Sequence, residues 1–148
     1  MAKVTDFGYS TIFTGDDLID MPISVPWNAP EHHHRGFDSI SAMKMDVYSF
    51  GLVCLWLLFF NSEKSHNDFL TALHNQTNLL DLSHSLVRAE AEQLNPAVCE
   101  AIKLLNFFEL ALANDPRQRT SSFQDLMQEL SPMKYAYRNR DTYIQECN

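Results

Sequence analysis

The stretch Asp46-Val47-Tyr48-Ser49-Phe50-Gly51-Leu52-Val53-Cys54-Leu55-Trp56-Leu57-Leu58-Phe59-Phe60 is the most apolar run in the 148-residue chain. A helix that is apolar on every side has no solvated face, so other helices or lipid must surround it. A bilayer span needs about 20 mostly apolar residues, and this run is shorter and bounded by Lys44, Glu63 and Lys64. We therefore predict a buried central helix that begins near residues 44–46. A strand pair and a membrane segment are the alternatives for such a short apolar run.

The bulk composition predicts one globular domain without a nucleic-acid or membrane partner. The chain carries 11 Lys and Arg against 19 Asp and Glu, a formal charge of -8, which disfavours binding to phosphate backbones or anionic membrane surfaces. Three cysteines, Cys54, Cys99 and Cys147, form an odd set without paired spacing and indicate reduced thiols. The first residues show no signal-peptide core. We expect a cytoplasmic or nuclear protein.

The N-terminal third is expected to be mostly loop. Residues 2–5 alternate as a strand does and run into Asp6-Phe7-Gly8, where glycine permits a sharp turn. Residues 9–25 have no sustained period and are predicted to form a long loop. The segment 26–31, Pro-Trp-Asn-Ala-Pro-Glu, is stiffened by two prolines and should anchor the end of that loop. We expect a short helix through His34 and then another loop over 37–43.

The remaining chain reads as helices. We predict a short helix over 68–73 and another from Ser83 or Ser85 to residue 94. Asn95-Pro96 is a helix start signal, and it opens a buried stripe made of Val98, Ile102, Leu105, Phe108 and Leu112. Ser121 and Gln124 form a capping box for a last helix, whose apolar face comprises Phe123, Leu126, Met127 and Leu130.

Four motifs occur in a familiar order: Asp6-Phe7-Gly8, Ala29-Pro30-Glu31, Asp46-Val47-Tyr48-Ser49-Phe50-Gly51, and Asp115-Pro116-Arg117-Gln118-Arg119. In order and spacing the chain resembles the C-terminal lobe of eukaryotic protein kinases, from the metal-binding Asp onward. The Pro26-Trp27 pair is similar to the tyrosine-kinase-like branch. The resemblance implies a mainly α fold: a helical C-lobe around one buried central helix, with a short β-strand end and a long activation-segment loop at the N-terminus.

The resemblance also implies domain limits and roles. It implies a partial kinase domain over 1–131, with an activation segment at 6–31 and a helical subdomain at 32–131, followed by a tail at 132–148. Asp6 matches the carboxylate that holds Mg²⁺ against the ATP phosphates. Phe7 matches the aromatic residue whose packing distinguishes active from inactive kinases. Four activation-segment residues are the implied candidate phosphosites: Ser10, Thr11, Thr14 and Ser24.

Three further residues receive structural roles from the resemblance. Glu31 and Arg119 look like the ion pair that ties the end of the activation segment to the last helices. Asp46 looks like the carboxylate that anchors the catalytic loop at the head of the central helix, where the helix dipole favours a negative charge. These roles are structural, and the resemblance assigns no catalytic or nucleotide-binding residue in this chain.

The departures from the kinase pattern set the functional expectation. The 148 residues contain no glycine-rich phosphate loop and no His-Arg-Asp catalytic loop, which in kinases supply the nucleotide contacts and the catalytic base. Mg²⁺ and ATP belong to a complete kinase domain, and we expect this chain alone to be inactive and to bind neither. The alternatives are a pseudokinase-like protein-binding module and a gene-model fragment. The expected partners are a protein substrate, another protein, or a second copy of this chain that binds through an exposed apolar surface.

Three neighbouring histidines make only an apparent metal motif. His32, His33 and His34 are consecutive, so on a short helix their side chains point in different directions and cannot share one ion. We expect them to form a solvated face.

Overall fold

The computed structural model describes residues 5, 7–13, 17–32, 35–60, 63–75, 78–94 and 98–130, and leaves out the side chains of residues 63–65, 94 and 98–100. Across these ranges the chain forms five α-helices: α1 (Ser39–Phe59), α2 (Glu63–His74), α3 (Leu79–Leu94), α4 (Val98–Leu112) and α5 (Phe123–Leu130). Two 3-10 turns, Phe7–Tyr9 and Pro116–Gln118, complete the elements. The described part contains no strand, so the expectation of a mainly helical protein is confirmed.

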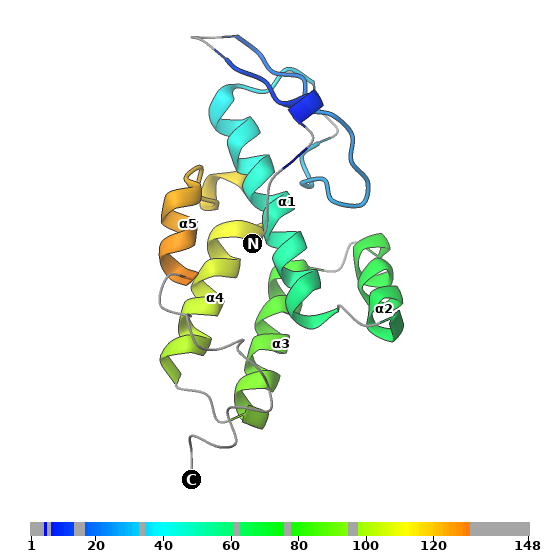
Figure 1. Ribbon diagram of the computed structural model, residues 1–148, viewed down its shortest axis with the longest axis vertical. Helices are drawn as coiled ribbons and strands as arrows, with labels where there is room; N and C mark the ends of the chain where they lie inside the picture. The colour runs from blue at the N-terminus through cyan, green and yellow to red at the C-terminus, as the bar shows by residue number, and fades with distance from the viewer. Residues whose placement is uncertain are drawn as a thin grey trace.

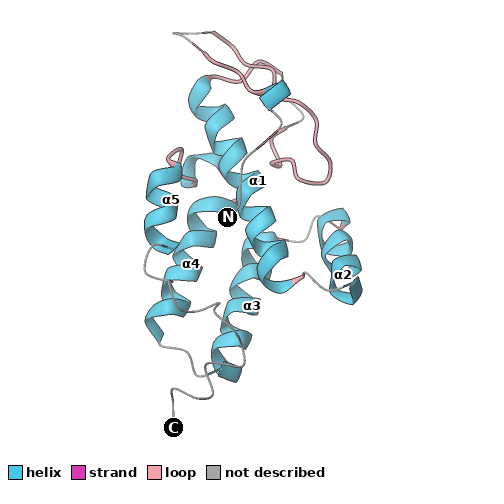
Figure 2. Ribbon diagram, viewed as in Figure 1, coloured by secondary structure: helices cyan, strands magenta, loops and turns pink. Residues whose placement is uncertain are grey.

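The predicted strand over residues 2–5 lies almost wholly outside the described residues, and Thr5 has no regular structure. Figure 2 shows the described residues before α1 as loop, apart from the 3-10 turn Phe7–Tyr9. The two sides of this loop meet at one antiparallel bridge, in which Ile19 and Phe37 exchange backbone hydrogen bonds of 2.7 and 2.9 Å. Residues 30–32 form a turn, so no helix begins there as predicted, and His33 and His34 lie outside the described residues.

Helix α1 runs through the centre of the molecule, alongside α4 (Figure 1). Val47, Leu52 and Leu55 are fully buried in the core cluster. Gly51 lets the two helices approach closely, because a Cβ there would lie only 2.8 Å from the Cβ of Ala111. By length and hydropathy alone α1 would also suit a membrane span; packing against α4 accounts for its apolar character on the core side.

The prediction that the central helix begins near residues 44–46 is wrong, because α1 begins at Ser39. The physical reason is the cap. Asp38 is the N-cap residue, and its carboxylate accepts hydrogen bonds from the Ser41 backbone N–H at 2.9 Å and the Ser41 hydroxyl at 2.8 Å. These bonds hold the pKa of Asp38 below its ordinary value. A capped start lets residues 39–43, predicted as loop, form the first turn of the helix.

The predicted buried stripe of α4 is only partly correct. Ile102 is 51% exposed and Leu105 is half-buried, whereas the buried positions are Leu104, Phe107, Phe108, Ala111 and Leu112. The difference arises because α4 packs against three helices, α1, α3 and α5. Its buried face is therefore wider than a single stripe and is rotated away from the predicted one.

The other helices also begin at different residues than predicted. Helix α2 covers a longer stretch than 68–73. Helix α3 starts at Leu79, not at Ser83 or Ser85, because the Asn78 side chain caps it and accepts a hydrogen bond from the Leu80 N–H at 3.2 Å. The cap of α5 is Ser122, whose hydroxyl oxygen accepts from the Asp125 N–H at 3.1 Å. This is one residue after the predicted capping box.

The predicted apolar face of α5 is also narrower than expected. Leu126 is fully buried, whereas Phe123 is 42% and Met127 47% exposed. The Asn95-Pro96 start signal lies outside the described residues.

Candidate functional site

A buried arginine joins the N-terminal loop to the far end of the chain. The guanidinium of Arg119 meets the carboxylate of Glu31 in a two-pronged contact, Nη1 to Oε1 and Nη2 to Oε2, both at 2.7 Å. The Arg119 side chain is 0% exposed and that of Glu31 18% exposed. The structure thus brings together the two residues that the resemblance pairs.

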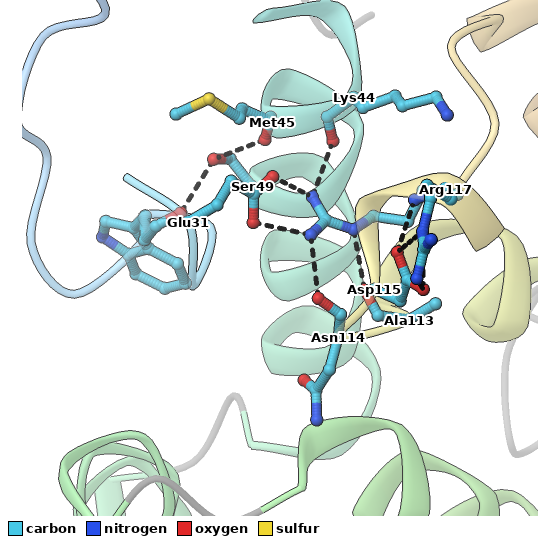
Figure 3. A network of polar contacts seen from close by, with 10 residues as sticks. Glu31, Lys44, Met45, Ser49, Ala113, Asn114, Asp115 and Arg117 are labelled. Carbon is cyan, nitrogen blue, oxygen red and sulfur yellow. Dashed lines mark hydrogen bonds and ion pairs between the residues drawn. The ribbon is translucent and has the colours of Figure 1, made fainter. Parts of the chain in front are cut away.

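The remaining donors of Arg119 are also used (Figure 3). Its Nε donates to the Ala113 carbonyl at 2.7 Å, Nη1 to the Lys44 carbonyl at 3.2 Å and Nη2 to the Asn114 carbonyl at 3.4 Å. A guanidinium has five N–H donors, so every one of them has an acceptor. Such full hydrogen bonding is what a buried charge requires.

Tyr48 lies against the same guanidinium, with the Arg119 Cζ 4.9 Å from the centre of its ring. That distance allows a cation–π contact. Burial raises the pKa of Tyr48 to about 12, a shift that Arg119 opposes and Glu31 reinforces. The tyrosine is therefore a neutral wall of the site across the physiological pH range.

The Asp115-Pro116 turn sets the direction of the arginines that follow. Asp115 caps the short 3-10 turn by accepting from the Arg117 N–H at 2.9 Å, and its carboxylate also binds the Arg117 side chain at 2.7 Å. These bonds lower the pKa of Asp115 to about 2. Arg117 stays on the surface, whereas Arg119, two residues later, turns inward.

The end of the N-terminal loop is fastened to α1 by hydrogen bonds and ring contacts. The Ser49 hydroxyl donates to the Trp27 carbonyl at 2.7 Å and also lies 3.1 Å from the Met45 carbonyl. The Trp27 ring meets the Trp56 ring edge to face, with centroids 6.4 Å apart. Within the loop, Asn28 accepts a hydrogen bond from the Ser24 N–H at 2.8 Å. Residues 24–31 are therefore held in one arrangement against the helical bundle.

Asp46 does not stand at the start of a helix. It lies inside α1, after the turns that begin at Ser39, so the predicted benefit from the helix dipole is absent. Its carboxyl is at the surface, yet partial burial raises its pKa above the ordinary value. Among the described residues it has no hydrogen-bond or ion-pair partner.

The other predicted site residues lie apart from this network. Asp6 and Thr14 lie outside the described residues. Ser10, Thr11 and Ser24 are exposed, and the first two line an open hollow of about 420 Å³ together with Asp20. Phe7 is 67% exposed and is not part of the hydrophobic core cluster.

His32 is half-buried, and its Nε2 lies 3.0 Å from the Pro22 carbonyl. This contact differs from the predicted solvated face. Over the ranges that the structure describes, no group of three or more His, Cys, Asp or Glu side chains could hold a metal ion.

Sequence reasoning missed several members of the network. Three acceptors of Arg119 are backbone carbonyls, which every residue carries, so nothing in the sequence marks them. Tyr48 and Ser49 could have been found, because they are polar-tipped side chains at the start of the long apolar run over residues 47–60.

Comparison with known families identifies the family of the chain. The family model described as protein tyrosine and serine/threonine kinase matches residues 1–130. Searches of curated proteins and of solved structures gave no match. Enzymes of this family use Mg²⁺ and ATP. The match extends over most of the 148 residues, and the chain therefore belongs to the protein tyrosine and serine/threonine kinase family.

Proposed function

We propose that this chain supplies the helical C-terminal lobe of a protein kinase domain of the tyrosine-kinase-like branch. The complete domain would transfer the γ-phosphate of ATP to Ser, Thr or Tyr of a protein. The observation that carries the proposal is the Glu31–Arg119 link, in which every guanidinium donor has an acceptor. Such a link fixes the end of a long loop against a helical platform, which is the arrangement a kinase needs to position a protein substrate.

In this proposal the activation segment is residues 6–31, and residues 32–131 form the helical subdomain. Ser10, Thr11, Thr14 and Ser24 are the candidate phosphosites. Asp6 would hold a metal ion in the complete domain.

We further propose that the chain alone transfers no phosphate. Phosphoryl transfer depends on positioned donors and on metal ions that stabilise developing charge. The 148 residues contain neither a glycine-rich loop nor a His-Arg-Asp motif, and Asp6 alone is one carboxylate where a kinase needs several groups. The residues present therefore do not fit an Mg-ATP site.

Thermal unfolding with and without Mg-ATP tests this proposal. Ligand that binds only the folded state raises the melting temperature, and we expect no rise for this chain. Incubation with Mg-ATP and a generic protein substrate should leave the substrate unphosphorylated. The D6N variant is the matched control, because any shift from weak Mg²⁺ binding at Asp6 would disappear in it. A saturable shift, or phosphate transfer above the D6N background, would refute the proposal.

A second candidate function is protein binding without nucleotide chemistry, including association of two copies. It is favoured by large apolar side chains exposed along the N-terminal loop. Ile12 is 96% exposed, and the others with high exposure are Phe7, Tyr9, Leu18, Ile23 and Val25. Exposed apolar surface of this kind marks interaction sites.

Light scattering across a range of protein concentrations tests for self-association. We expect oligomers that the double variant I12S/L18S weakens, whereas I102S, an exposed change on α4, should leave them unaltered. A monomer that binds no hydrophobic dye would contradict this second function.

A further inference from the structure

Helix α2 has a single polar attachment to the central helix among the described residues. It stands to one side of the α1, α3, α4 and α5 bundle (Figure 1). The indole Nε1 of Trp56 on α1 donates a hydrogen bond of 3.0 Å to Nδ1 of His66 on α2. The two rings meet edge to face, with centroids 6.0 Å apart and planes at 78°.

The direction of this bond fixes the protonation of His66. An indole nitrogen can only donate, so Nδ1 of His66 must offer its lone pair, and the imidazole must carry its proton on Nε2. When the ring gains a second proton, both nitrogens become donors. Two N–H groups would then face each other, and the hydrogen bond would be lost. The indole edge is also the positive side of the aromatic quadrupole, so it repels the new charge.

No neighbour on α1 is placed to compensate that charge. Residues 47–60 contain no Asp, Glu, Lys, Arg or His. Burial raises the pKa of Tyr48 to about 12 and that of Cys54 to about 11, so both stay neutral. Residues 25–28, which contact α2 through Trp27, contain no titratable side chain.

On α2 itself, Asp68 is two residues from His66 and so projects from a different side of the helix. No carboxylate forms an ion pair with His66 in the described part of the chain. Glu63 lies three residues before His66, and its side chain and that of Lys64 are outside the description. The test of His66 therefore includes a Glu63 variant, which shows whether Glu63 pairs with the protonated ring.

Among the described residues, Phe69 gives α2 apolar contacts with its surroundings, and other residues of α2 line a hollow. The Phe69 ring lies 5.7 Å from Trp27 and 5.2 Å from Phe60, centre to centre. The chain also has an open hollow of about 600 Å³, with one wall formed by Val25, Pro26 and Asn28 and the other by Leu70, Leu73 and His74 of α2. A change in how α2 is held would change the shape of this hollow.

We propose that the Trp56–His66 hydrogen bond is a proton-sensitive latch that fastens α2 to the central helix. With a neutral His66 the latch is closed. Acidification that protonates His66 opens it, loosens α2 and widens the hollow between α2 and residues 25–28. This regulation is separate from the proposed kinase role and does not depend on it.

Hydrogen exchange measured by mass spectrometry on the whole chain tests the latch. Between about pH 8 and pH 5, the range in which histidines change charge, protection of the α2 amides, corrected for intrinsic exchange, should fall about tenfold, as expected for the loss of one hydrogen bond. Protection of α4 should not change in parallel. Trp27 and Trp56 are the only two tryptophans and both belong to this cluster, so their fluorescence should follow the same transition.

Variants assign the transition to the latch. H66N keeps an acceptor at the Nδ1 position without a titratable group, so α2 should stay protected at both pH values. W56F removes the donor and should loosen α2 already at pH 8, and H74Q, on the same helix, should behave as the wild type. The same pH response in H66N, or equal protection of wild-type α2 at both pH values, would overturn the proposal. So would greater protection at pH 5 that E63Q abolishes, because a Glu63–His66 pair would then dominate.

Discussion

Replacing Arg119 by lysine should destabilise the fold although the charge is retained. Arginine offers five N–H donors in a planar fork, and lysine offers three. Arg119 uses all five, two on Glu31 and three on backbone carbonyls. At least two acceptors must therefore lose their donor in R119K. At about 1–1.5 kcal/mol for each lost bond, the free energy of unfolding should fall by about 2–3 kcal/mol.

Urea unfolding followed by tryptophan fluorescence measures this loss, because Trp27 lies on the segment that the ion pair anchors. R117K is the matched control: the same change is made two residues away, at a side chain that is 90% exposed, and it should leave the unfolding midpoint almost unchanged. The reasoning would be refuted if R119K stayed within about 0.5 kcal/mol of the wild type, the usual range for surface substitutions, or matched R117K.

A double-mutant cycle separates the Glu31 contact from the carbonyl contacts. E31Q leaves Arg119 buried beside a neutral partner and should also be destabilising, because a buried charge loses its counter-charge. Since the two side chains touch, the loss in E31Q/R119K should be smaller than the sum of the single losses. Additive losses would show that the carbonyl acceptors, and not the carboxylate, hold Arg119 in place.

Three further predictions concern α1. G51A should lower the free energy of unfolding by about 1–3 kcal/mol in thermal unfolding, because its Cβ would overlap Ala111; an unchanged or higher stability would show that α4 can move away. D38A should cost about 1 kcal/mol through loss of the cap. The folded pKa of Asp38 is lowered, so the stability that its carboxylate contributes is fully present above the pKa of the unfolded carboxyl and is lost as pH falls through the folded pKa. D38N should keep its cap in acid. Urea titrations at several pH values distinguish the wild type from D38N. Cys54, with its pKa raised to about 11, should react with iodoacetamide far more slowly at neutral pH than a free thiol, as mass spectrometry of the labelled peptide would show.

The sequence predicted the helices far better than their ends. The run from Asp46 to Phe60 identified α1 because so apolar a run needs a packing partner, although Val53 and Leu57 on the run remain exposed. Its start was misplaced because Asp38 and Ser41 form a local cap, and a chain with several possible caps does not reveal which one is used. The α4 stripe was misassigned for another reason. A helix that packs on three sides buries more positions than a single spaced pattern can identify, so Ile102 was assigned to the core in place of Leu104.

In the candidate site, only the contact between two side chains that both belong to recognised motifs could be predicted. Glu31 and Arg119 came from the resemblance, whereas the carbonyls that complete the arginine's hydrogen bonding depend on the path of the backbone after α4. No sequence pattern indicates the Trp56–His66 hydrogen bond. Its partners are ten residues apart on two different helices, and only the angle between those helices brings them together.

The Glu31–Arg119 bond also has a consequence for the order of folding. It closes a loop between positions 88 residues apart, and joining the ends of such a loop costs on the order of 4 kcal/mol of chain entropy. Helix pairs that are close in sequence, such as α3 with α4, meet no such barrier, so we expect the ion pair to form after the main folding barrier. Weakening it should then speed unfolding and leave the folding rate nearly unchanged. On this expectation the ion pair sets how long the N-terminal loop stays packed on the bundle, and hence how often that loop becomes accessible to proteases and partners.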